Sequence, residues 1–60
     1  MTQTSNPAGR RNRPFTVYLH NDETGELMDM RIMAKSMRDA EDIAADRTNY
    51  EWIIDSVEEN

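Results

Sequence analysis

Two stretches of alternating apolar and polar residues, separated by a short polar segment, constrain the fold of this chain more than any other feature. One face of the first stretch would carry Phe15, Val17 and Leu19, and one face of the second Met28, Met30, Ile32 and Ala34. A period of two is typical of a β-strand with one buried face. Between them, residues 21–25 contain turn formers and a glycine that can adopt a positive φ. The sequence therefore predicts a β-hairpin.

The segment after the hairpin has the signals of an amphipathic helix. Ser36 is a favourable N-cap, and Asp39, three residues later, can reach back as a short form of the capping box. Asn49 is a plausible stop for a helix of about three turns. At helical spacing the apolar face would carry Met37, Ala40, Ile43 and Ala44, and the outer face Arg38, Glu41, Asp42 and Asp46.

Residues 50–57, Tyr50 to Val57, are rich in aromatic and β-branched side chains, which favours a third strand. Both of its faces are partly apolar, so the residues alone leave its register open. The predicted fold is α+β, with the order β-β-α-β: a three-stranded antiparallel sheet and one helix packed on one face. One helix covers only one face of a sheet. The apolar residues in excess of a one-sided core are Tyr18, Leu27, Met33 and one of Trp52 and Ile53.

The first residues differ in composition from the rest of the chain. Residues 1–13 contain little that could be buried, which predicts a flexible basic tail followed by one small domain over residues 14–60. They lack the apolar segment of a signal peptide, and the chain has no apolar run of the roughly 20 residues that a membrane span needs. We expect a cytoplasmic protein.

The charge is divided unevenly along the chain. The net charge of −5 comes from 12 acidic and seven basic residues, but Arg10, Arg11 and Arg13 give the first 14 residues a formal charge of +3 and leave −8 for the rest. The residues after the first 14 form a strongly acidic body, which would not be attracted to nucleic acid. Its acidic surface could steer the protein to a basic groove of a partner, or could serve solubility alone.

The sequence predicts neither an enzyme nor a metal or cofactor site. It has 60 residues, no cysteine and a single histidine, His20, with no nucleophile motif beside it. The acidic segment 21–26 is much shorter than a calcium-binding loop. The predicted function is binding to another protein. The residues predicted to contact that partner are Asp39, Glu41, Asp42 and Asp46 on the helix, Tyr18, Arg31 and Met33 on the sheet, and Arg10, Arg11 and Arg13 in the tail.

Four segments carry a resemblance to a known family: Phe15-Thr-Val, residues 30–36 (Met-Arg-Ile-Met-Ala-Lys-Ser), residues 37–44 (Met-Arg-Asp-Ala-Glu-Asp-Ile-Ala) and residues 52–57 (Trp-Ile-Ile-Asp-Ser-Val). Their order resembles that of the small phage-encoded inhibitors of bacterial RNA polymerase. The resemblance implies a β-β-α-β body with an acidic helix that binds the largest subunit of the polymerase near the downstream DNA channel and blocks open-complex formation.

The resemblance departs from the family in the last strand. The family presents arginines there, where this chain has Ser56 and Glu58. The resemblance therefore implies that basic contacts come from Arg31 or from the residue 10–13 arm. Two alternatives stay open: an anti-CRISPR or other anti-defence inhibitor that mimics DNA, and a self-associating structural or accessory protein whose strand edge pairs with its own copy.

Overall fold

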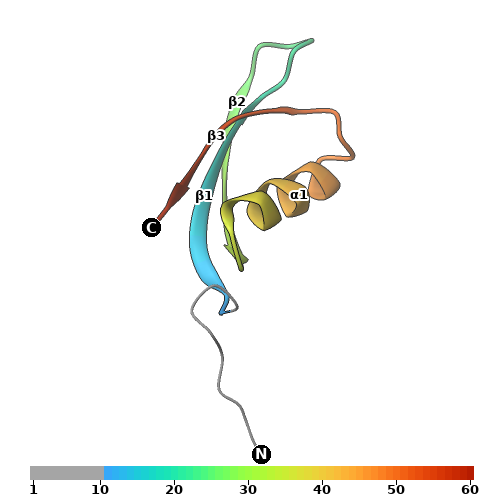
Figure 1. Cartoon of the computed structure of the whole chain (residues 1–60). Helices are drawn as coiled ribbons and strands as arrows, with labels where there is room; N and C mark the ends of the chain where they lie inside the picture. Colours follow the sequence, from blue (N-terminus) through green and yellow to red (C-terminus); the bar gives the residue numbers. More distant parts are fainter. Residues whose placement is uncertain (1–10) are drawn as a thin grey trace, which may run out of the picture.

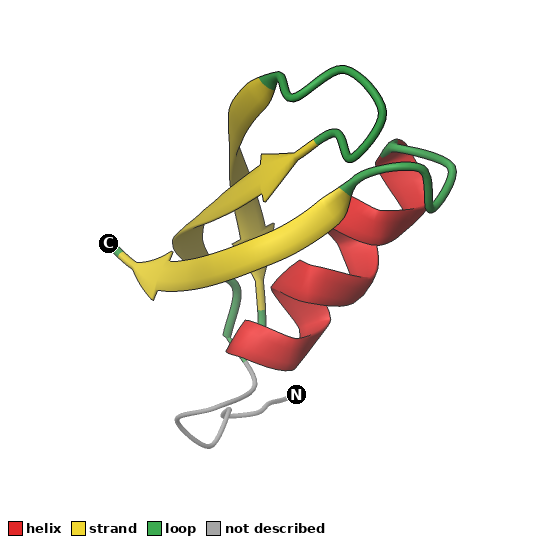
Figure 2. Cartoon of the chain, turned by 90° about the horizontal axis from the view of Figure 1, so that it is seen from above, coloured by secondary structure: helices red, strands yellow, loops and turns green. Residues whose placement is uncertain are grey.

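The computed structural model describes residues 11–60, which form a three-stranded antiparallel sheet and one helix (Figure 1). The elements are β1 (Arg13–His20), β2 (Leu27–Ala34), α1 (Met37–Arg47) and β3 (Ile53–Glu59). The strand order is β2-β1-β3, so β1 is central and both other strands are edges. Figure 2 shows α1 lying across one face of the sheet. The predicted fold class is confirmed.

The predicted hairpin forms with an unbroken register from Arg13 opposite Ala34 to His20 opposite Leu27. Its turn is organised by Asn21, whose side-chain Oδ1 accepts hydrogen bonds from the backbone N–H groups of Glu23 (2.9 Å) and Thr24 (3.1 Å). Gly25 has φ +79°, a conformation that L-residues rarely adopt. The β1 strand begins at Arg13, one residue before the predicted start of the domain, and residues 1–10 lie outside the described part of the chain.

The two ends of α1 are determined by local capping. Ser36 Oγ accepts a hydrogen bond from the Asp39 backbone N–H at 3.1 Å, as predicted for the N-cap. In a capping box the Asp39 carboxylate would accept the backbone N–H of Ser36. Here it accepts the backbone N–H of Lys35, the residue before the N-cap, at 3.0 Å. At the other end Asn49 has φ +55°, and Tyr50 N–H donates to Ala45 O at 2.9 Å. This is a Schellman ending, and it confirms Asn49 as the helix stop.

The core lies between α1 and one face of the sheet. Its buried residues are Phe15, Val17, Leu19, Ile32, Ala34, Ala40 and Ala44, against which Met28, Met30, Ile43, Trp52, Ile54 and Val57 are partly buried. The predicted inner faces of β1 and β2 are confirmed. Met37 was predicted for the core, and this is wrong: it is 51% exposed. It is the first residue of α1, directly after the exposed residues 35 and 36, and the buried stripe of the helix starts one turn later, at Ala40.

The third strand begins later than the predicted Tyr50 and contains an irregularity. Tyr50 has φ +61°, which is incompatible with a strand, and the residues up to Trp52 connect α1 to β3. The register of β3 shifts between Tyr18 and Leu19, so that Ile54 pairs with Leu19 and Val57 with Val17. This β-bulge lets two residues three positions apart both face the core. Within residues 11–60, no helix is long and apolar enough to cross a membrane.

Candidate protein-binding surfaces

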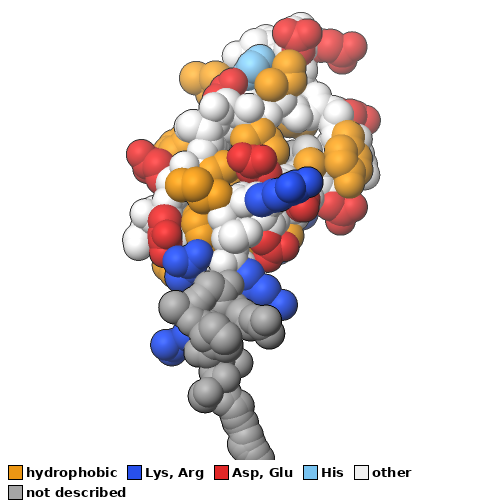
Figure 3. Space-filling view, viewed as in Figure 1, with side chains coloured by type: hydrophobic (Ala, Val, Ile, Leu, Met, Phe, Trp, Pro, Cys, Tyr) orange, Lys and Arg blue, Asp and Glu red, His pale blue; other side chains and the backbone are white. Residues whose placement is uncertain are grey.

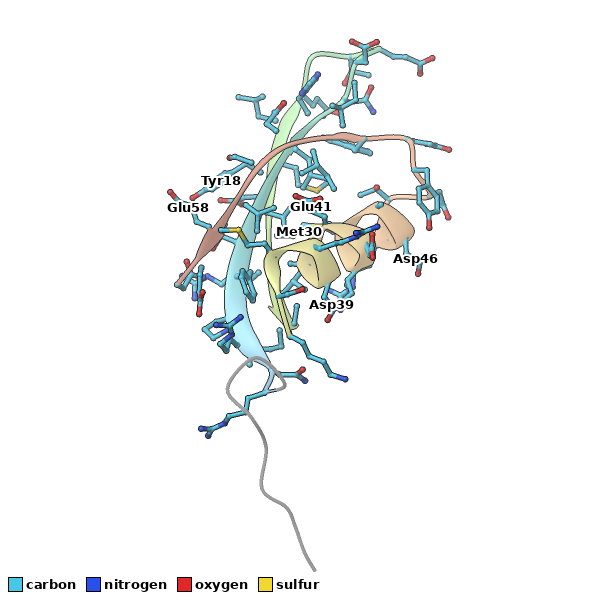
Figure 4. All side chains as sticks on the ribbon, in the orientation of Figure 1. Tyr18, Met30, Asp39, Glu41, Asp46 and Glu58 are labelled. Atoms are coloured by element: carbon cyan, nitrogen blue, oxygen red, sulfur yellow. The ribbon has the colours of Figure 1, made fainter. Side chains whose placement is uncertain are left out.

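The acidic residues predicted on the outer side of α1 are exposed. Glu41, Asp42 and Asp46, which we call the acidic helix surface, are all exposed on the helix that covers one side of the sheet. Figure 4 labels Glu41 and Asp46 on this helix. Within residues 11–60, none of them has a basic side-chain nitrogen within ion-pair distance. Their negative potential is thus not offset by a paired side chain in the described part of the chain, and a cationic surface could approach it.

Asp39 differs from the other helix acids. It is partly buried, and its carboxylate accepts the Lys35 backbone N–H in the first turn of α1. A carboxylate at this position also interacts favourably with the helix dipole. The structure therefore gives Asp39 a role in starting the helix. Glu41, Asp42 and Asp46 have no comparable hydrogen bond among the described residues.

The face of the sheet opposite to α1, here called the open face, carries the predicted excess apolar residues. The exposed fractions are 37% for Tyr18, 82% for Leu27, 57% for Met33 and 45% for Ile53, whereas Trp52 packs against the core. Arg31 is exposed on the same face, opposite Thr16 and next to the Tyr18 and Asp29 pair. The sheet therefore separates the residues predicted to contact a partner protein into two surfaces. Tyr18, Arg31 and Met33 share the open face, and the helix acids lie on the other side.

Tyr18 is held in place on the open face by a residue that sequence reasoning did not select. Its hydroxyl donates to Glu58 Oε1 of β3 at 3.1 Å, and the two side chains lie together in Figure 4. The hydrogen bond and the negative charge of Glu58 raise the pKa of the Tyr18 phenol above its ordinary value of 10.0. Because the contact depends on the register of β3, the sequence alone contained no signal for it.

His20 and Asp55 form a second link between β1 and β3. His20 Nδ1 lies 2.8 Å from Asp55 Oδ1 and 3.0 Å from Oδ2, and Asp55 sits at the register shift of β3. Beside this pair is a shallow depression of about 420 Å³. Its lining residues are Tyr18, Leu19, Leu27, Met28, Asp29 and Asp55. In the described residues no group of His, Asp and Glu side chains is arranged to hold a metal ion.

Of the three arginines predicted for the tail, Arg13 is engaged within the domain. Its guanidinium forms an ion pair with Glu59 Oε2 at 3.1 Å, donates to Lys35 O at 3.0 Å and lies 5.5 Å from the centroid of the Phe15 ring. It joins the ends of β1, β2 and β3. Arg11 is exposed, and Arg10 lies outside the described residues.

Acidic and basic side chains are distributed differently over the visible surface of the described residues. In Figure 3 acidic side chains extend from the hairpin to the end of β3, and most of the visible Lys and Arg side chains gather near the start of β1.

Comparison of the chain with protein-family models, with curated protein sequences and with solved structures finds no match.

Proposed function

We propose that this is a non-enzymatic protein of phage type that binds and inhibits a host nucleic-acid enzyme, with bacterial RNA polymerase, through its largest subunit, as the first candidate. The acidic helix surface is the primary contact and enters a basic groove. The open face supplies a second contact. A protein that occupies a DNA-binding groove blocks the enzyme by competition with DNA.

One observation carries this proposal: the exposed carboxylates of Glu41, Asp42 and Asp46 are not paired with a basic side chain of the described domain. A group of unpaired like charges on a small body costs self-repulsion. Opposite charges on a partner would relieve that repulsion, and would also accelerate the encounter. The order of elements resembles that of the phage inhibitors of RNA polymerase, which supports the choice of the first candidate.

The test is a promoter-dependent transcription assay with purified bacterial RNA polymerase. We expect the protein to inhibit open-complex formation, and the triple variant Glu41→Lys/Asp42→Lys/Asp46→Lys to lose inhibition by about tenfold or more. The matched control is Asp22→Lys/Glu23→Lys/Glu51→Lys, which changes the net charge equally at exposed positions outside α1. Circular dichroism checks that both variants fold.

Two results would contradict the proposal in different ways. Equal inhibition by the wild type and the helix variant would remove the acidic helix surface as the contact. No inhibition by the wild type would remove RNA polymerase. Capture of another nucleic-acid enzyme from a host lysate, lost only in the helix variant, would then favour the runner-up, an anti-defence inhibitor that mimics DNA.

A further inference from the structure

The two edges of the sheet differ in how well they are protected against pairing with another strand. Natural edge strands are commonly blunted by bulges, charges or proline. The β3 edge has a register shift and carries the carboxylates of Asp55, Glu58 and Glu59. The eight residues of β2 pair with β1 without a shift and include neither proline, glycine nor lysine, and the two charged residues of β2, Asp29 and Arg31, have opposite signs. The β2 edge is therefore the one that can accept a further strand.

The backbone of β2 presents its free hydrogen-bonding groups at alternate residues. The Pro14 carbonyl accepts from Asn60 N–H at 2.9 Å, so it points toward the β3 side of β1. In an antiparallel pair the two residues opposite each other either exchange hydrogen bonds or both direct their groups outward. Met33, opposite Pro14, thus directs its N–H and C=O away from β1. With the unbroken register, Leu27, Asp29 and Arg31 do the same.

The same residues of β2 have their side chains on the open face. Along the strand their order is apolar, acidic, basic and apolar: Leu27, Asp29, Arg31 and Met33. All of them are exposed, and neither Asp29 nor Arg31 has an ion-pair partner within residues 11–60. Read in the opposite direction the order is apolar, basic, acidic and apolar. The strand is therefore complementary to an antiparallel copy of itself.

We propose that two copies of this chain form a symmetric dimer by antiparallel pairing of β2 with β2 about a two-fold axis at Met30. In this register Asp29 lies opposite Arg31 of the second copy, and Leu27 lies opposite Met33 of the second copy. Opposite charges and apolar pairs at facing positions stabilise a sheet. The outward N–H and C=O groups of each strand meet those of its copy, which is the requirement for an antiparallel ladder.

The neighbouring registers are unfavourable. A shift of the second strand by two residues in one direction places Asp29 opposite Asp29 of the second copy. The same shift in the other direction places Arg31 opposite Arg31 of the second copy. Like charges directly opposite each other are destabilising. Registers between these would oppose outward backbone groups to inward ones. The dimer joins the two sheets into one continuous sheet and places both helices on the same side. This proposal is independent of the partner proposed above.

The first experiment is a charge exchange followed by sedimentation velocity. The wild type should pass from 7.0 kDa toward twice that mass between about 10 μM and about 1 mM protein. Asp29→Arg and Arg31→Asp should each raise the dimer dissociation constant by about tenfold or more, because each creates facing like charges. The double variant Asp29→Arg/Arg31→Asp should dimerise again, and an equimolar mixture of the two single variants should form heterodimers.

The second experiment tests the register directly, using the absence of cysteine from the sequence. At the two-fold axis the Met30 residues would form a pair without hydrogen bonds, in which Cα atoms are about 4.5 Å apart, within the range that a disulfide spans. Met30→Cys should therefore give a disulfide-linked dimer under mild oxidation. Met33→Cys is the matched control on the same strand and should not, because its copy lies roughly six residues further along the strand, about 20 Å away.

Several outcomes would overturn the dimer. These are a strict monomer at about 1 mM, a double charge variant that dimerises no better than the single ones, or faster cross-linking of Met33→Cys than of Met30→Cys. Circular dichroism of every variant separates loss of pairing from loss of folding. If the wild type is monomeric, the β2 edge would be free for a strand of a different protein.

Discussion

The chain contains two leucines that lie on the same hairpin and differ almost only in burial, which allows a sharp test of the core. Leu19 is 1% exposed in the central strand, whereas Leu27 is 82% exposed at the start of β2. Truncation of a buried leucine to alanine costs about 2–5 kcal/mol, because apolar contact is lost and a cavity remains. A domain of this size has a free energy of unfolding of roughly 3–9 kcal/mol. Leu19→Ala should therefore remove much of the stability.

The measurement is urea unfolding followed by circular dichroism, at a concentration where the chain is monomeric. We expect the midpoint of Leu19→Ala to fall sharply, to the point that part of the population is unfolded without denaturant. Leu27→Ala should change the free energy of unfolding by less than about 0.5 kcal/mol. If the two variants had equal midpoints, the placement of the core between α1 and the inner face of the sheet would be refuted.

Four further predictions concern the ends of α1 and the open face. Ser36→Ala should lower the free energy of unfolding by about 1 kcal/mol, because the Asp39 N–H loses its acceptor; urea unfolding measures this. Asn49→Gly should raise it by up to about 1 kcal/mol at the positive φ, and Asn49→Val should lower it, in the same assay. Glu58→Gln should lower the pKa of Tyr18 toward 10.0, followed by ultraviolet absorbance. Because the pKa of Tyr18 is raised in the folded state, the stability that it contributes should be fully present below pH 10.0 and should be lost as the pH rises from 10.0 through the raised pKa.

The predictions that the structure confirms are those that depend on neighbouring residues. The period of two placed Val17 and Ile32 on the inner face, and the cap residues Ser36 and Asn49 were recognisable because they act within one turn of chain. The prediction that Met37 lies in the core is wrong for the opposite reason. Its position in the helical period is correct, but whether another element covers the first turn of α1 is decided by tertiary packing, and Met37 is exposed.

The same distinction applies to the candidate surfaces. The exposure of Glu41, Asp42 and Asp46 followed from the helical period. Their separation from Tyr18 by the sheet did not, since it required the side on which α1 packs. The link from Tyr18 to Glu58 required the register of β3. Side chains brought together by strand pairing carry no fixed spacing in sequence, so periodicity cannot reveal them.

By itself the sequence determined the elements, their order and the inner faces of the hairpin, because alternation, turn residues and caps are local properties of a chain. Only the tertiary structure decided the register of the third strand. Neither face of residues 50–57 is wholly apolar, and the bulge resolves this by turning both Ile54 and Val57 toward the core. That choice is made by contacts with Leu19 and Val17, which are more than 30 residues away along the chain. It also gives β3 a register shift, whereas β2 pairs with β1 without one.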